Sequence, residues 1–184
     1  MIRIFLAAAF FLLALPAHAT EAGWALLREG GQVVLMRHAY TLGTTDAEAF
    51  DFADCSTQRN LSDRGRQQAR KMGALFAAKG APVHRVYSSR LCRALDTARL
   101  AFQRIPIEEF PPLDPPLGDA EYDAESRATV LDLVRNYRGS DNIVMVTDLG
   151  TIQALTGRTA REGEALIVRP GEDLLPVQAR IIFN

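Results

Sequence analysis

Short apolar runs alternate with amphipathic segments along this chain, and the alternation predicts strands and helices in turn. Residues 32–37, 83–88 and 142–147 are brief apolar runs, each of which predicts a buried strand. Two further strands are expected near the end of the chain, at 165–169 and 177–183. The chain therefore supplies enough strands for a single sheet.

Helices are predicted between these strands. Ser62 can cap a helix that runs to about Lys79 and stops at Gly80, because the apolar positions in between fall on one helical face. Shorter helices are expected at 21–28, 91–102, 125–137 and 152–156. Residues 39–60 are polar and predict a long loop, a feature that is usually functional in a compact domain, whereas residues 106–116 are proline-rich and predict irregular structure.

Strands that alternate with helices predict an α/β fold, a three-layer sandwich with a largely parallel sheet. In such sheets a ligand binds outside the carboxyl ends of the strands. Three segments lie there: Arg37-His38, residues 88–93 and residues 147–150. The search for chemistry therefore concentrates on these segments.

The overall charge of the chain excludes one class of partner. The 184 residues carry 21 basic and 22 acidic side chains, for a formal net charge of −1. A nucleic-acid-binding protein would show a basic stripe, so no nucleic acid is expected as a partner. A length of this size corresponds to one domain, and any bound anion must be held by a few well-placed cations.

The amino-terminal segment differs from the rest. Arg3 precedes an apolar run over residues 4–15, and the small-x-small sequence at 17–19 matches a cleavage site. We expect a signal peptide at 1–19 and a mature domain at 20–184, exported to a bacterial periplasm or secreted. An uncleaved anchor or a buried helix are the alternatives. No second long apolar stretch follows, so no membrane span is expected after cleavage.

Two cysteines, Cys55 and Cys92, lie 37 residues apart. An oxidising compartment would permit a disulfide between them, and closing such a loop would stabilise the fold by roughly 4 kcal/mol. Two free thiols are the alternative. With only His38 and His84 remaining after cleavage, these residues do not form the ligand pattern of a zinc site.

His38 directly follows the first predicted strand and is the candidate nucleophile. An imidazole with a pKa near 6.5 is partly neutral at pH 7, so one ring nitrogen can attack phosphorus. The adjacent Arg37 offers a planar fork of donors for phosphoryl oxygens. A histidine that only hydrogen-bonds a carbonyl at the strand end is the alternative.

Four segments place this pair in a wider pattern. They are VVLMRHAYT at 33–41, LSDRGRQQA at 61–69, VYSSRLCRALDTA at 86–98 and NIVMVTDLGTIQALTG at 142–157. In this order they resemble the motifs of the histidine phosphatase superfamily, the phosphoglycerate-mutase-like family, with Ala39 in place of the usual glycine. The resemblance implies the fold expected above and a reaction that uses no metal and no cofactor.

The resemblance also implies roles for individual residues. Arg37 and Arg93 would hold the phosphoryl group, and His38 would form a phosphohistidine. Fixed cations would stabilise the charge that spreads over the equatorial oxygens in the transition state. A covalent intermediate would divide hydrolysis into two easier displacements.

Other candidate residues are less firmly implied. Arg90 stands where a proline is common in the family; it either contacts substrate or forms a salt-bridged surface charge. Thr41 and Arg59, in or beside the long loop, are candidate substrate contacts. Asp119 and Glu121 are candidates for the acid/base carboxylate, with ordinary exposed loop acids as the alternative.

The chain departs from the family pattern at Asp148, where the resemblance implies a second catalytic histidine. An ionised carboxylate accepts hydrogen bonds and cannot donate one to a phosphoryl oxygen. Losing one such donor commonly costs about a hundred- to a thousandfold in rate. Two alternatives remain open: Asp148 is protonated and acts as a general acid, or it pairs with Arg37 or Arg93 and occupies the clamp.

The sequence thus predicts an exported phosphomonoesterase that works through a phosphohistidine and is weakened by Asp148. The substrate would be a phosphorylated small molecule or a phosphorylated macromolecule. The alternative is an inactive relative that binds phosphate or a phospholigand without turnover, and Asp148 is the residue that favours it.

Overall fold

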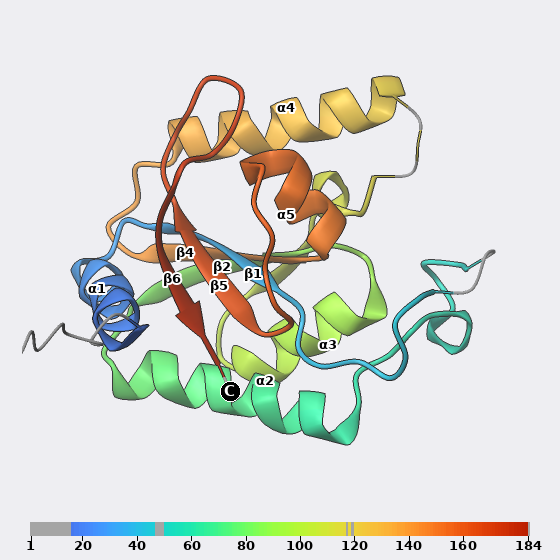
Figure 1. Ribbon diagram of the computed structural model, residues 1–184, viewed down its shortest axis with the longest axis horizontal. Helices are drawn as coiled ribbons and strands as arrows, with labels where there is room; N and C mark the ends of the chain where they lie inside the picture. Colours follow the sequence, from blue (N-terminus) through green and yellow to red (C-terminus); the bar gives the residue numbers. More distant parts are fainter. Residues whose placement is uncertain (1–15, 47–49, 117, 119, 184) are drawn as a thin grey trace, which may run out of the picture.

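A six-stranded mixed sheet with helices on both faces forms the fold (Figure 1). The computed structural model describes residues 16–46, 50–116, 118 and 120–183. The strands are β1 (Val33–Arg37), β2 (Val83–Ser88), β3 (Ile107–Glu109), β4 (Asn142–Thr147), β5 (Glu164–Val168) and β6 (Val177–Ile182). The helices are α1 (Pro16–Glu29), α2 (Asp63–Ala78), α3 (Cys92–Ala101), α4 (Ala120–Asn136) and α5 (Leu149–Thr156), with 3-10 turns η1 (Cys55–Thr57) and η2 (Pro111–Leu113).

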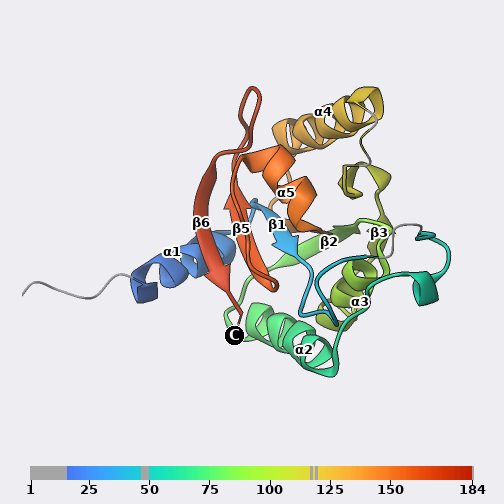
Figure 2. The same ribbon diagram turned by 45° about the vertical axis from the view of Figure 1, so that its right-hand side comes forward.

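The helices form two layers around the sheet. Helices α1, α2 and α3 cover one face, while α4 and α5 cover the other (Figures 1 and 2). Strand alternation supplies both cores: Val34 and Met36 of β1 join the first, and Val33 and Leu35 join the second. The expected three-layer α/β sandwich is confirmed.

The strand order is β3-β2-β4-β1-β5-β6. Strands β3, β2, β4 and β1 are parallel, whereas β5 and β6 are antiparallel additions at one side. Arg37 is level with Thr147, and Ser88 is level with Val146. The carboxyl ends of β1, β2 and β4 therefore meet at one edge of the sheet, which is where ligands bind in such folds.

Local signals account for most element boundaries. The Ser62 side chain accepts a hydrogen bond from the amide of Gly65, so it caps α2 as predicted. The proline-rich segment differs from the expectation because it contains η2 and the short strand β3. Strand β3 pairs only with β2 at the edge of the sheet, and an edge position tolerates neighbouring prolines.

The amino-terminal prediction falls largely outside the described residues. Residues 1–15 are not described, and α1 includes the predicted cleavage segment at 17–19. In the part of the chain that is described, no helix combines the length and the apolar character needed to cross a membrane. Signal cleavage and export remain predictions.

Candidate active site

His38 lies at the carboxyl end of β1 and is completely buried. Its amide donates to the carbonyl of Thr147 over 3.0 Å, which fixes it beside the end of β4. Its Nδ1 lies 2.8 Å from the carbonyl oxygen of Ala39. Because a carbonyl only accepts, Nδ1 carries the proton and Nε2 keeps its lone pair in the neutral ring. Burial lowers the pKa of His38, which favours this neutral form.

Asp148 faces this lone pair from the end of β4. Its Oδ1 accepts from the amide of Gly150 over 3.1 Å and caps α5. Its Oδ2 accepts from Nη2 of Arg93 over 2.8 Å and from Nε over 3.2 Å. The same Oδ2 lies 3.4 Å from Nε2 of His38, a close contact without hydrogen-bond geometry.

The ionisation of Asp148 follows from these contacts. Burial opposes the charged form, but the contacts with His38 and Arg93 outweigh it and lower the pKa of Asp148 far below its usual range. Because the His38 contact lacks hydrogen-bond geometry, we attribute the ionised state mainly to Arg93. The sequence left two alternatives for Asp148, a protonated general acid or a carboxylate paired with an arginine. In the structure Asp148 is paired with Arg93, and this pairing favours the ionised carboxylate over the protonated acid.

Arg93 stands in the first turn of α3 and is 2% exposed. Besides Asp148, it binds Asp46, whose Oδ1 accepts from Nη1 over 2.7 Å. Asp46 comes from the long loop, and no sequence signal separates it from the other loop acids. The predicted phosphate clamp is therefore held by two carboxylates of the chain itself.

Arg37 points away from this group. Its Nη1 donates to the carbonyl of Ala160 over 2.8 Å, and its Nη2 lies 3.9 Å from Oε1 of Glu162. Arg37 thus neighbours His38 in sequence without sharing the Asp148–Arg93 contact.

Thr41 and Arg59 both contact Glu162, which also approaches Arg37. The sequence did not single out this carboxylate. The hydroxyl of Thr41 donates to Oε1 of Glu162 over 2.7 Å and accepts from Nη1 of Arg59 over 2.6 Å. Arg59 also approaches Oδ2 of Asp148 to 3.9 Å. Glu162 lies in the turn before β5, where its sequence context resembles any polar loop.

Buried polar atoms without partners gather at this edge. Among the described residues they are Nε of Arg37, Nε2 of His38, Nε of Arg59 and Oγ of Ser89, together with Nε of Arg127 in α4. The first four all belong to segments at the carboxyl ends of β1 and β2 or to the adjoining loop. Buried polar groups normally have partners, so the two guanidinium Nε donors and the Ser89 hydroxyl indicate a site for acceptors such as phosphoryl oxygens, while Nε2 of His38 offers a lone pair.

Arg90 is not brought to His38. Its Nε and Nη2 each lie 2.7 Å from Oδ2 of Asp114, and its guanidinium lies 4.4 Å from the centroid of the Phe52 ring. Arg90 therefore has the salt-bridged role that was its alternative interpretation.

The predicted acid/base carboxylates lie outside what the structure describes. Asp119 is not among the described residues, and Glu121 belongs to α4 without a described side chain. In the described ranges, no three His, Cys, Asp or Glu side chains gather closely enough to bind a metal.

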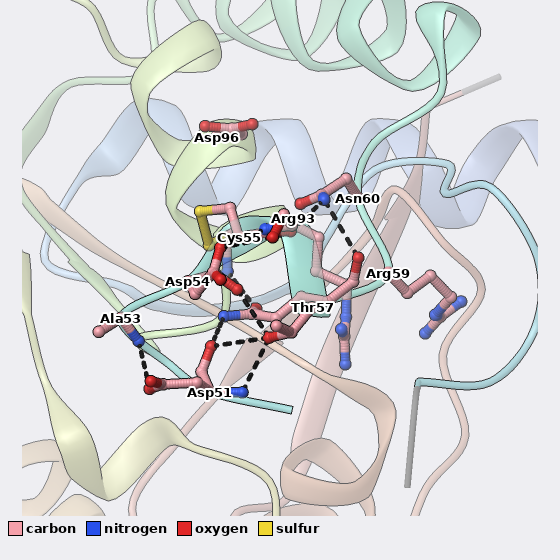
Figure 3. Close-up of a disulfide and its surroundings, with 12 residues drawn as sticks. Asp51, Ala53, Asp54, Cys55, Thr57, Arg59, Asn60, Arg93 and Asp96 are labelled. Atoms are coloured by element: carbon pink, nitrogen blue, oxygen red, sulfur yellow. Dashed lines mark hydrogen bonds between the residues drawn. A yellow bond between two sulfur atoms is a disulfide. The ribbon is translucent and has the colours of Figure 1, made fainter. Parts of the chain in front are cut away.

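Cys55 and Cys92 form a disulfide, the first of the two alternatives left open by the sequence. Figure 3 shows this bridge beside Arg59 and Arg93, which come from the two segments that it joins. The amide of Cys92 also donates to Oε1 of Gln58 over 2.9 Å. The loop that supplies Asp46 and Arg59 is thus attached to the first turn of α3, directly before Arg93.

Solved structures with this fold include several phosphatases. A protein histidine phosphatase, SixA, complexed with tungstate is 20% identical and has a TM-score of 0.59, covering 82% of this chain and 96% of its own. The α-ribazole phosphatase from Shigella flexneri is 17% identical, with a TM-score of 0.57 and coverage of 80% and 95%. A phosphoserine phosphatase variant from Entamoeba histolytica, complexed with phosphoserine, is 17% identical, with a TM-score of 0.56 and coverage of 81% and 95%.

No curated protein matches this chain significantly in sequence. The family model of the histidine phosphatase superfamily (branch 1) matches residues 33–114, which contain Arg37, His38 and Arg93. The remaining part, including β4 and α5, completes the fold shared with the solved phosphatases. The chain thus resembles the histidine phosphatase superfamily over residues 33–114 and shares its fold with solved phosphatases over most of its length.

Proposed function

We propose that this protein is an exported phosphatase that hydrolyses phosphomonoesters through a phosphohistidine at His38. The observation that carries the proposal is the fixed tautomer of His38: Nδ1 donates to the carbonyl of Ala39, and Nε2 holds a free lone pair. The names of the similar solved structures, which include phosphatases, support a phosphorylated substrate.

The reaction would take two displacements. Nε2 of His38 attacks phosphorus, the P–O bond to the alcohol breaks, and the alkoxide takes a proton from an acid or from water. A water molecule then attacks phosphorus, the P–N bond to His38 breaks, and the proton of the water passes to the base left by the first step or to solvent, which releases phosphate and neutral His38. Arg93 and Arg59 are placed to balance the negative charge on the equatorial oxygens.

Asp148 would weaken this reaction. Its Oδ2 lies 3.4 Å from Nε2 and 2.8 Å from Arg93, where an oxygen of the phosphoryl group would bind. The substrate must therefore displace a carboxylate that already has a charged partner. Breaking a buried charge pair is costly unless the incoming group restores it, so we expect slow turnover.

Export is part of the same proposal. The apolar run before Thr20 supports a signal peptide, and the Cys55–Cys92 disulfide fits an oxidising compartment. Mass spectrometry of protein from a bacterial periplasm should give a mature chain that begins near Thr20. Secreted material that retains Met1 would contradict this part.

A second candidate function rests on the burial of the nucleophile. His38 is 0% exposed, and its Nε2 lies 3.4 Å from Oδ2 of Asp148. A protein with this arrangement could bind a phosphorylated ligand through Arg93 without completing the transfer to His38. We therefore keep the inactive phospholigand-binding protein as the alternative.

One pair of variants separates these functions. Asp148→His replaces the acceptor by a donor, so turnover of p-nitrophenyl phosphate should rise at least tenfold, a modest part of the roughly hundred- to thousandfold worth of such a donor. Adding His38→Ala should abolish the gain, because the nucleophile is then missing.

The outcomes discriminate clearly. A fast wild-type enzyme that Asp148→His slows would show that Asp148 works as an acid, contrary to our account. If both proteins are inert on phosphomonoesters from acidic to neutral pH while tungstate still binds, the binding function is correct.

A further inference from the structure

A cationic hollow is lined in part by Arg37, the residue before His38. It has a volume of about 500 Å³ and is lined by Arg37, Arg161, Arg180 and Glu164, together with Thr159, Ala160 and Ile182. We call it the arginine cavity. Arg37, which lines this cavity, is the neighbour of His38 in the chain.

Strand alternation places these side chains together. Arg37 follows Val33 and Leu35 on the face of β1 that carries α4 and α5. Ala165 of β5 pairs with Met36, so Glu164 lies near the end of β1. Strand β6 runs antiparallel to β5, and its pairing brings Arg180 opposite Leu166 on this same face.

The cavity has more positive charge than its own carboxylate can balance. Glu164 is 3% exposed and accepts from Nη1 of Arg180 over 2.9 Å, so these two charges cancel. Arg161 is exposed, and its side chain has no partner among the described residues. Nε of Arg37 is buried without a hydrogen-bond partner. Arg161 therefore carries the unbalanced positive charge, and Arg37 adds one donor without a partner, its Nε.

This cavity contrasts with a smaller hollow that Arg37 also lines. That hollow, of about 340 Å³, is lined by Arg59 and Glu162 and by Tyr40, Gly43 and Thr44. Glu162 already contacts both arginines there, at 3.3 Å from Arg59 and 3.9 Å from Arg37. The surplus positive charge therefore lies on the Arg161 side.

We propose that the arginine cavity binds a second anionic group of the substrate while the phosphoryl group lies at His38. This inference rests on the proposed function, and it narrows the substrate to phosphomonoesters with a further phosphate or carboxylate. Arg37 would contact the substrate between its two anionic groups. Guanidinium groups suit this role because they bind phosphate and carboxylate alike through paired hydrogen bonds.

Binding of synthetic phosphonates tests the inference without requiring turnover. The ligands are alkane bisphosphonates with spacers of one to six methylene groups, each compared with the alkylphosphonate of equal length. Calorimetry on the full mature protein should find at least one bisphosphonate that binds tenfold or more tightly than its monophosphonate. An equal series of alkylphosphonates with a terminal carboxylate separates a preference for phosphate from one for carboxylate.

Arg161→Gln is the decisive variant, because the Arg161 side chain is exposed and its loss leaves no buried partner. Arg169→Gln removes the same charge at an exposed position just beyond the far end of β5. The ratio of bisphosphonate to monophosphonate affinity should fall to near one in Arg161→Gln and stay unchanged in Arg169→Gln. A ratio near one in the wild type, or a ratio that survives Arg161→Gln, would overturn the inference.

The proposed function fails through a different readout. If Arg93→Ala leaves the affinity for monophosphonates unchanged, the centre at His38 does not hold a phosphoryl group. The ratio measured with Arg161→Gln reports on the arginine cavity alone.

Discussion

The ends of the two central strands, β1 and β4, lie side by side and carry opposite chemistry. At the end of β1, Arg37 and His38 provide a guanidinium and a free ring nitrogen, as the superfamily pattern implies. At the end of β4, Asp148 supplies an acceptor where that pattern implies a donor. Both strands are parallel neighbours in the sheet, so the difference in chemistry comes from the Asp148 side chain.

An aspartate at position 148, in place of the histidine that the pattern implies, changes the charge of the whole site. Around His38, the cations Arg59 and Arg93 are matched by Asp46 and Asp148. An incoming phosphoryl group must exchange with these internal acceptors, whereas a second histidine would have donated to it. On the proposed function, the carboxylates that bind Arg93 therefore compete with the phosphoryl group for the same cation.

Removing the disulfide should have the largest effect on the fold of this edge. Cys55→Ser with Cys92→Ser opens a 37-residue loop, so the free energy of unfolding should fall by about 4 kcal/mol. Urea unfolding of the variant and of the oxidised wild type measures this loss. Equal stability would mean that the bridge does not hold the loop of Asp46 and Arg59 against α3.

Thiol labelling gives the matching chemical test. Unfolded, unreduced protein from a bacterial periplasm should show no reactive thiol. Two labelled thiols per chain would contradict the disulfide.

Removing either arginine compares the two sides of the site directly. Arg93→Ala should weaken tungstate binding by about 2–3 kcal/mol, the worth of a charge-assisted pair of hydrogen bonds, and Arg37→Ala, whose guanidinium points away from Asp148, should weaken it less. The effect of Arg93→Ala should be the larger, because Asp46 and Asp148 then remain as unpaired charges that repel the anion. Arg90→Ala is the control, since Arg90 binds Asp114 instead.

Two results would contradict this comparison. Unchanged tungstate binding in Arg93→Ala would remove this residue from the clamp. Equal losses in Arg90→Ala and Arg93→Ala would show that only the overall charge matters.

The pH dependence of stability should be the smallest effect. Burial lowers the pKa of His38 below its unfolded value of about 6.5, so the unfolded chain binds more protons below that pH and stability falls on acidification. Asp148, with its lowered pKa, adds a further loss as the pH falls below about 4. Unfolding of His38→Asn from pH 7.5 to 5 should show a shallower decline than the wild type. An identical slope would mean that His38 is already charged in the fold.

The sequence predicts the fold well because its signals are local. The apolar runs that became β2 and β4 and the Ser62 cap depend on neighbours in the chain. Strand β3 was missed because its three residues lie among prolines and are stabilised only by pairing with β2.

The site was predicted in part, for a related reason. His38, Arg37 and Arg93 stand out because they follow motifs, and Asp148 stands out as their exception. Asp46 and Glu162 could not be found, because each lies in a polar loop and gains its role only when the chain brings it to an arginine.

The central claim is that the carboxylate of Asp148 occupies the place of a phosphoryl oxygen. Asp148→Asn tests it most directly, because asparagine keeps an oxygen to cap α5 and removes only the charge beside Arg93 and His38. Asp63→Asn, at an almost fully exposed side chain in α2, controls for net charge. By calorimetry, Asp148→Asn should bind tungstate at least tenfold more tightly than the wild type, while Asp63→Asn should not differ. Equal or weaker binding in Asp148→Asn would show that this carboxylate does not compete for the site.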